Sequence, residues 1–205
     1  MERRELHLNI PLSEEVVRDL RVDDVVYLNG TATALFYDDH FQVIMDKIKA
    51  GEELPMELKD GVGYHTGAIY VKHGEGEYDM LAIGSTTSAK FNALTPEFIR
   101  LTGIRAFIGK GGMDAATLEA MEECGCVYLA ASGGCSSFYA PKVKITGEYW
   151  PELTPVWNQR LRFELTECGP FFVGMDAHGN SIYDQCEEET RKNMAAIYEK
   201  LGVTE

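Results

Sequence analysis

The chain lacks long apolar runs and an excess of basic residues, and each absence excludes a class of protein. No run approaches the roughly 18 apolar residues of a membrane-spanning helix, and residues 1–7 lack the apolar core of a signal peptide. With 19 Lys and Arg against 33 Asp and Glu, the 205-residue chain has a formal net charge of −14, which disfavours binding to nucleic acid or to anionic lipid. We therefore expect a cytoplasmic protein that folds as a single domain over residues 1–205.

The chain also lacks the cysteine spacing of a disulfide framework or a zinc ribbon. Its cysteines are odd in number and include no Cys-x-x-Cys pair: Cys124, Cys126, Cys135, Cys168 and Cys186. The first three could be thiolate ligands of an iron–sulfur cluster, but their spacing matches none of the familiar ligand runs and Cys126 begins an apolar strand. We interpret them as structural cysteines of a protein in a reducing compartment, and we expect no metal ligated by this chain.

Turn and cap signals divide the middle of the chain into alternating strands and helices. A helix starts at Thr95-Pro96-Glu97, which offers a hydroxyl cap, a proline at the first position and an acid in the first turn. A second helix starts at Asp114 and closes near Gly125, and the apolar strands 105–108 and 127–131 follow the two helices. This alternation predicts an α/β domain with parallel strand pairs, whose ligands gather at loops that leave the strands' carboxyl ends.

Periodicity predicts the remaining elements. Strands are expected at 5–10, 25–28, 63–71, 80–83, 142–145, 160–165 and 171–175, and helices at 38–49 and from about 187 to 201. A polar connection is expected at 13–20, a turn at 73–77 and a connection around Trp150.

Two glycine-rich loops, Gly84–Lys90 and Ile108–Met113, each follow a predicted strand and carry a lysine. Exposed backbone N–H groups, hydroxyls and a compact positive charge together suit a small carboxylate. The second loop is not a nucleotide-binding P-loop, which requires glycine where this chain has Ile104 and Ser or Thr where it has Gly111. By itself that loop is equally a tight turn with a solvated lysine; the other lysine loop and the Gly133-Gly134 turn favour a binding site.

Three further groups have both a functional and a structural interpretation. The pair Thr86-Thr87 is typical of turns, and a threonine acts as a base only where its surroundings lower its pKa greatly. The run Asp38-Asp39-His40 could begin a metal site, but adjacent helical side chains point apart, so acids at a helix start are the better interpretation. The turn Asp176-Ala-His-Gly-Asn180 could present an acid–base pair, and we interpret it as structural.

Taken in order, these segments resemble the β subunit, or C-terminal domain, of class I iron–sulfur hydro-lyases, the family of class I fumarases and L(+)-tartrate dehydratases. The resemblance runs from about Leu6 to Tyr183. The matching segments are Leu28-Asn-Gly-Thr31, His40, Gly51-Glu-Glu-Leu-Pro55, Thr86-Thr87, Ile108-Gly-Lys-Gly-Gly-Met113, Val127-Tyr-Leu-Ala-Ala131, Tyr149-Trp150 and Asp176-Ala-His-Gly-Asn180.

The resemblance implies a swivelling β/β/α domain that closes over a cluster-bearing α subunit in a hetero-oligomer. Three cysteines of that partner would bind a [4Fe–4S] cluster whose open iron acts as a Lewis acid on the departing hydroxyl, which fits the missing cluster motif here. The implied reaction is reversible anti elimination of water from a small hydroxy di-acid, with cations stabilising the aci-carboxylate formed when the neighbouring proton leaves.

The resemblance also implies roles for individual residues. Thr86 matches the catalytic base and Lys110 a catalytic cation, while Lys90 takes the position of the family's arginine clamp. Substrate-binding positions are implied for Thr87, for His40 and for the backbone of Gly111 and Gly112.

Four positions depart from the family's pattern. Phe36 and Tyr37 stand where the family has Arg-Asp, Lys90 replaces an arginine and so loses the planar fork, and Ser85 replaces a proline. One hypothesis is an active subunit for a less anionic or bulkier hydroxy acid, with Phe36 and Tyr37 reshaping the pocket. The alternative is a non-catalytic or regulatory module that binds small anions on the same fold.

Overall fold

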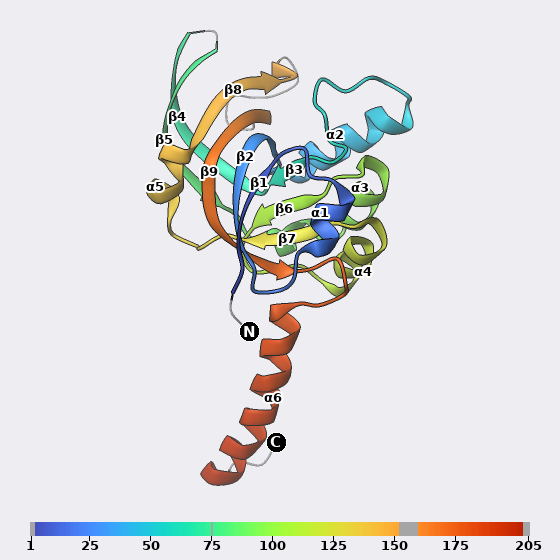
Figure 1. Ribbon diagram of the computed structural model, residues 1–205, viewed down its shortest axis with the longest axis vertical. Coiled ribbons are helices and arrows are strands. Elements are labelled where there is room, and N and C mark those ends of the chain that lie inside the picture. The colour runs from blue at the N-terminus through green and yellow to red at the C-terminus, as the bar shows by residue number, and fades with distance from the viewer. Residues whose placement is uncertain (1–2, 75, 152–159, 203–205) are drawn as a thin grey trace.

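The computed structural model describes residues 3–74, 76–151 and 160–202, and these form a mixed α/β structure (Figure 1). A seven-stranded sheet has the order β1-β2-β3-β6-β7-β9-β8, and β4 and β5 form a separate two-stranded sheet. The strands are β1 Glu5–Asn9, β2 Val25–Ala34, β3 Val62–Tyr64, β4 Thr66–Gly74, β5 Glu77–Ser85, β6 Ala106–Gly109, β7 Val127–Ala130, β8 Val143–Tyr149 and β9 Arg160–Met175. The helices are α1 Glu14–Asp19, α2 Asp38–Lys49, α3 Thr95–Thr102, α4 Ala115–Cys124, α5 Ser136–Tyr139 and α6 Ile182–Leu201, with short 3-10 turns η1 Ser88–Phe91 and η2 Ala140–Lys142.

The predicted parallel strand pairs are confirmed. Strands β2, β3, β6 and β7 are parallel neighbours. Strand β9 runs antiparallel to β7 and also pairs with β2, so these five strands close on themselves. In this ring the carboxyl ends of β3, β6 and β7 lie next to one another, which places the loops that follow them at one edge.

Both faces of the central strands are buried. Helices α2, α3 and α4 cover one face (Figure 1), where Phe41, Phe98 and Phe107 belong to one apolar cluster. Alternate strand residues point to the opposite face, where Tyr64 and Phe163 belong to a second cluster. Burial on both faces explains why the central strands are short continuous apolar runs instead of alternating ones.

Several predicted elements need correction. The connection expected at 13–20 contains α1, because the Ser13 hydroxyl accepts a hydrogen bond from the Val16 amide at 3.2 Å and Val17 is buried. The strand expected at 63–71 is divided at His65 between β3 and β4, which belong to different sheets. The strands expected at 160–165 and 171–175 are one strand, β9, whose pairing with β2 continues through two register shifts.

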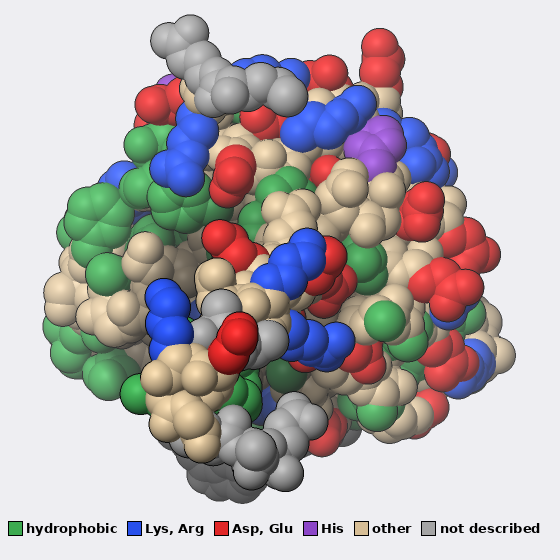
Figure 2. Space-filling view, turned by 90° about the horizontal axis from the view of Figure 1, so that it is seen from below, with side chains coloured by type: hydrophobic (Ala, Val, Ile, Leu, Met, Phe, Trp, Pro, Cys, Tyr) green, Lys and Arg blue, Asp and Glu red, His purple; other side chains and the backbone are tan. Residues whose placement is uncertain are grey.

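The C-terminal helix begins earlier than predicted and projects from the rest of the structure (Figure 1). It starts at Ile182 because the Ser181 hydroxyl accepts from the Asp184 amide at 3.3 Å. Acidic and basic side chains are interspersed on the face seen from the α6 end (Figure 2). None of the helices in the described part of the chain is long and apolar enough to cross a membrane. The connection predicted around Trp150 falls largely on 152–159, outside the described residues.

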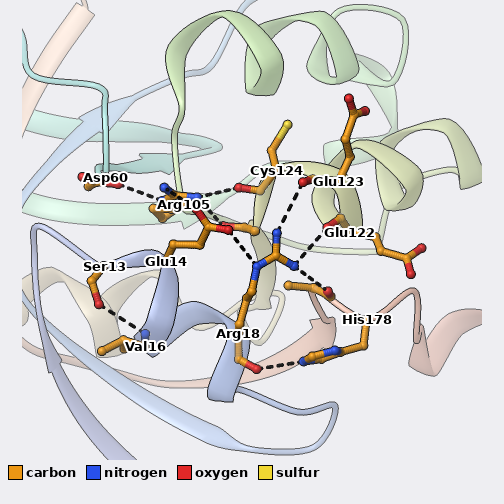
Figure 3. A network of polar contacts seen from close by, with 12 residues as sticks. Ser13, Glu14, Val16, Arg18, Asp60, Arg105, Glu122, Glu123, Cys124 and His178 are labelled. Carbon is orange, nitrogen blue, oxygen red and sulfur yellow. Dashed lines mark hydrogen bonds and ion pairs between the residues drawn. The ribbon is translucent and has the colours of Figure 1, made fainter.

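Two arginines bind the carboxyl end of α4 and tie it to α1 (Figure 3). Arg18 donates to the carbonyl oxygens of Glu122 at 3.2 Å and Glu123 at 3.3 Å. Arg105 donates to the Cys124 carbonyl and forms ion pairs with Asp60 at 2.8 Å and Glu14 at 3.3 Å. The last carbonyls of a helix have no partner within the helix, so these contacts fix the helix that follows the Lys110 loop.

Candidate functional site

The two lysine loops are joined by backbone hydrogen bonds. The Lys110 amide donates to the Thr86 carbonyl at 3.3 Å, and the Ser88 amide donates to the Lys110 carbonyl at 3.1 Å. The Thr86 amide in turn donates to the His65 carbonyl at 2.8 Å. Thr87 and Lys110 therefore face each other as an isolated parallel bridge, and the structure brings Thr86, Thr87 and Lys110 together.

The route by which the loops meet differs from the prediction in one respect. Only Lys110 follows a strand of the parallel set, β6. The loop with Thr86 and Lys90 follows β5 of the separate hairpin. It pairs with Lys110 just beyond the carboxyl end of β6. A third loop completes the group, since a Cβ on Gly133 would lie 3.7 Å from Cδ of Lys110.

Lys90 lies among aromatic rings. Its ammonium nitrogen is 4.5 Å from the ring centroid of Phe36, 4.8 Å from that of Phe91 and 6.0 Å from that of Tyr37, all within the range of cation–π attraction. The Phe36 ring fits there because residue 67 is glycine, whose added Cβ would lie 3.1 Å from it. Phe36 and Tyr37 thus form an aromatic wall against which Lys90 packs.

The pKa of Lys90 lies below its ordinary value. Partial burial is the main cause, and the positive charge of Lys110 lowers the pKa further, while Asp38 acts in the opposite direction. Two ammonium groups close enough to repel each other would both gain from an anion bound between them. Lys90 and Lys110 therefore supply two neighbouring cations for one anion.

His40 is fully buried at the start of α2. Its Nδ1 accepts a hydrogen bond from the Phe36 amide at 3.3 Å, and its ring meets that of Tyr37 edge-on at a centroid distance of 5.8 Å. His40 therefore lies behind the aromatic wall. Contact between its ring and a substrate stays a prediction, and the observed contacts make it a support for Phe36 and Tyr37.

The two glycines after Lys110 differ in their surroundings. Both have positive φ, 84° for Gly111 and 73° for Gly112. A Cβ on Gly111 would meet nothing within 4 Å, whereas one on Gly112 would lie 2.5 Å from the Tyr183 ring. The Gly111 backbone is thus open to a ligand, and Gly112 is a packing position.

Sequence reasoning missed three buried side chains behind these loops. His65 Nδ1 lies 2.9 Å from the Ser88 hydroxyl, which lies 2.9 Å from the Tyr128 hydroxyl. Burial, with a contribution from Lys90, lowers the pKa of His65 to about 3, so the imidazole is neutral. In the sequence, His65 and Tyr128 each lie in a predicted strand and Ser88 lies in a predicted loop. Nothing in that pattern indicates that the three side chains contact one another.

Arg160 is a second feature that the sequence did not reveal. Its side chain is 3% exposed and donates to Asp39 at 3.0 Å, and burial lowers its pKa. Among the described residues its Nε and Nη1 have no hydrogen-bond partner. The contact ties the start of β9 to the first turn of α2, next to the aromatic wall.

The structural interpretations of two other motifs are supported. The Asp176 carboxylate accepts from the amides of His178 and Asn180, each at 3.0 Å, and His178 Nε2 donates to the Arg18 carbonyl at 2.8 Å (Figure 3). The Cys126 thiol is fully buried and its pKa is raised by that burial, which suits a structural cysteine.

The comparisons with known proteins agree with this arrangement. A family model described as fumarase C-terminus matches residues 1–186, so the chain belongs to this family. It is 38% identical over 192 residues to a putative L(+)-tartrate dehydratase subunit beta of Methanocaldococcus jannaschii, covering 93% of this chain and 94% of that protein. It is 32% identical over 198 residues to the L(+)-tartrate dehydratase subunit beta of Escherichia coli K12, covering 95% and 94%. A putative fumarate hydratase class I of Geobacillus stearothermophilus is 33% identical over 207 residues, which cover 98% of this chain and 38% of that longer protein. The predicted family is confirmed.

Proposed function

We propose that the chain is the β subunit of a cytoplasmic hydro-lyase that adds water to, or removes it from, a small hydroxy acid. The fold is proposed to be the swivelling β/β/α domain of this family, formed as one unit by residues 1–205. The relatives named as tartrate dehydratase subunit beta and fumarate hydratase support this activity. The observation that carries the proposal is the backbone junction of Thr86 with Lys110, with Lys90 near enough for the charge of Lys110 to act on its pKa.

The proposed roles follow from this geometry. The Thr86 hydroxyl takes the proton from the carbon next to the leaving hydroxyl, and Lys110, on the adjoining strand end, stabilises the negative charge that develops on the carboxylate. Lys90 binds a substrate carboxylate from the other side, and Thr87 and the open backbone of Gly111 add hydrogen-bond donors. A cationic setting also lowers the pKa of a neighbouring hydroxyl, which a threonine base requires.

The aromatic wall indicates how this subunit differs from relatives with an arginine there. A guanidinium can bind a carboxylate through two parallel hydrogen bonds, whereas Lys90 supplies a point charge beside the rings of Phe36 and Tyr37. We propose that the substrate has one carboxylate at Lys110 and Lys90 and a less anionic or bulkier group against the wall.

The [4Fe–4S] cluster of this enzyme class is proposed to belong to the partner α subunit. Among the described residues no group of three or more His, Cys, Asp or Glu side chains is placed to hold a metal ion. The steps assigned to this chain are therefore proton removal and carboxylate binding.

Anaerobic purification of the tagged protein from its native cells tests the proposal. The complex should contain a partner whose cysteines bind a cluster, together with iron and sulfide, and it should hydrate or dehydrate at least one member of a hydroxy-acid panel. Thr86→Ala should abolish turnover without affecting assembly or iron content, whereas the matched variant Ala89→Ser, in the same loop, should remain active. Near-normal turnover of Thr86→Ala would exclude the base role. Tight binding of a hydroxy acid without turnover, with an iron-free partner or none, would instead establish the anion-binding module.

A further inference from the structure

A buried chain of hydrogen bonds runs behind the two lysine loops. Its three members are fully buried or nearly so and come from the β3–β4 junction, the Thr86 loop and β7: His65, Ser88 and Tyr128. At the centre is Gly109, since a Cβ there would lie 1.9 Å from the Ser88 hydroxyl, 2.9 Å from the Tyr128 hydroxyl and 3.2 Å from His65 Nδ1. Gly109 thus provides the space in which the three polar atoms meet, directly before Lys110.

We propose that this relay is a positioning device of the site, with Ser88 as the residue that locks the Thr86 loop against the Lys110 loop. The inference rests on the proposed function. Ser88 makes contacts in both directions: its backbone amide donates to the Lys110 carbonyl at 3.1 Å, while its side chain is held by His65 and Tyr128. If the Ser88 side chain lost its two partners, the loop could shift at Ser88, and Thr86, two residues earlier, would then move relative to Lys110.

Hydrogen-bond accounting gives the relay a direction. Either hydroxyl can be the donor in the contact between Tyr128 and Ser88, so in one order Tyr128 donates to Ser88 and Ser88 donates to His65 Nδ1. This order leaves one polar group without a conventional partner, the Nε2–H of His65. The reverse order leaves two, the Tyr128 proton and the Nε2 lone pair, and each unmade buried bond is costly.

The surroundings of His65 favour the same order. Its ring packs against Phe91 at 4.9 Å and Phe107 at 5.0 Å between centroids, and Nε2 has no hydrogen-bond partner in the described structure. An N–H can point at an aromatic face, whereas a lone pair is repelled by it. The inferred form is the neutral imidazole protonated at Nε2, which the lowered pKa of about 3 permits.

Hydrogen exchange of the full-length chain tests the positioning role without any assay of activity. Ser88→Ala should accelerate exchange about tenfold or more in peptides covering 84–92 and 106–113 together. Thr102→Val is the matched control, because Thr102 is a buried hydroxyl that makes two hydrogen bonds at the end of α3. It should leave both peptides unchanged. Unchanged exchange of the two loops in Ser88→Ala would overturn the relay.

A second variant and a spectroscopic measurement on the wild-type chain test the relay even if Ser88→Ala fails to fold. Tyr128→Phe removes one hydroxyl and keeps the ring, so it should accelerate exchange in the same two peptides. In the wild-type chain, the nitrogen-15 shifts of His65 should show a protonated Nε2 and an unprotonated Nδ1, and a protonated Nδ1 would overturn the inferred direction.

Kinetics of the assembled complex complete the test. Ser88→Ala should lower kcat about 30-fold or more, with KM changed less than about threefold, because the loss falls on transition-state alignment. Thr102→Val should leave kcat within about twofold. A kcat of Ser88→Ala equal to that of the control would overturn the positioning role. If the wild-type complex proves inactive, the proposed function fails, and hydrogen exchange alone decides the relay.

Discussion

Gly111 and Gly112 form a natural matched pair for measuring how the site is built. Both lie in the Lys110 loop and both have positive φ, so alanine imposes a similar backbone cost at either position. They differ in space, because an alanine Cβ at 112 would lie 2.5 to 2.7 Å from three atoms of the Tyr183 ring. Gly112→Ala should therefore destabilise the protein more than Gly111→Ala.

The magnitude follows from these two contributions. A positive φ costs a non-glycine residue about 1–2 kcal/mol, which is the whole expected loss for Gly111→Ala. Overpacking against the ring adds about 1–3 kcal/mol for Gly112→Ala. For a protein of this size each kcal/mol lowers Tm by roughly 2–4 °C, so the two melting temperatures should be clearly separated.

Thermal and urea unfolding of the full chain measure the difference, and Tyr183→Ala identifies its cause. In the Tyr183→Ala background Gly112→Ala should cost only what Gly111→Ala costs, because the obstructing ring is gone. Equal stability of the two glycine variants, or an unchanged penalty without the ring, would refute the reasoning. In the assembled enzyme, Gly111→Ala should also weaken substrate binding, because the Gly111 backbone is open to the ligand.

Three further predictions concern the cap, the contacts of Arg105 and pH. Asp114→Ala should cost about 1 kcal/mol of unfolding free energy, because the carboxylate accepts from the Thr117 amide at 3.0 Å; an unchanged urea midpoint would exclude this capping role. Arg105→Met should cost about 2 kcal/mol, mainly because it leaves the carbonyls of Cys124 and Gly125 without their donor. The exposed Arg191→Met should cost under about 0.5 kcal/mol, and equal urea midpoints would contradict this. The affinity for a hydroxy-acid inhibitor should be constant at pH values below the lowered pKa of Lys90 in the free protein. It should weaken as the pH rises from that pKa towards the higher pKa that Lys90 has when the anion is bound. Calorimetric titration measures this dependence, which should be absent in Lys90→Met.

Local patterns predicted the elements of the site better than their connections. The glycine-rich loops and the Asp114 cap depend on neighbouring residues, so they could be identified from the sequence. The hydroxyl cap predicted at Thr95 was wrong, because Leu94 precedes the first helical residue and the Thr95 hydroxyl donates to the Phe91 carbonyl. The strand break at His65 could not be, because its residues favour a strand on both sides and only pairing with different neighbours separates them. Helix α1 was missed because a short segment with one buried side chain has little periodicity.

The sequence by itself determined the parallel β-α units, the family and the residue types available for chemistry, because apolar runs, caps and turns are encoded within a few positions. Only the tertiary structure decided that β9 closes the sheet onto β2, that the rings of Phe36 and Phe91 lie beside the Lys90 ammonium group, and that His65, Ser88 and Tyr128 meet beside Gly109. These contacts join residues 23 and 40 positions apart in the relay. They depend on strand register and on how the β4–β5 hairpin is placed against the main sheet, and local sequence spacing specifies neither.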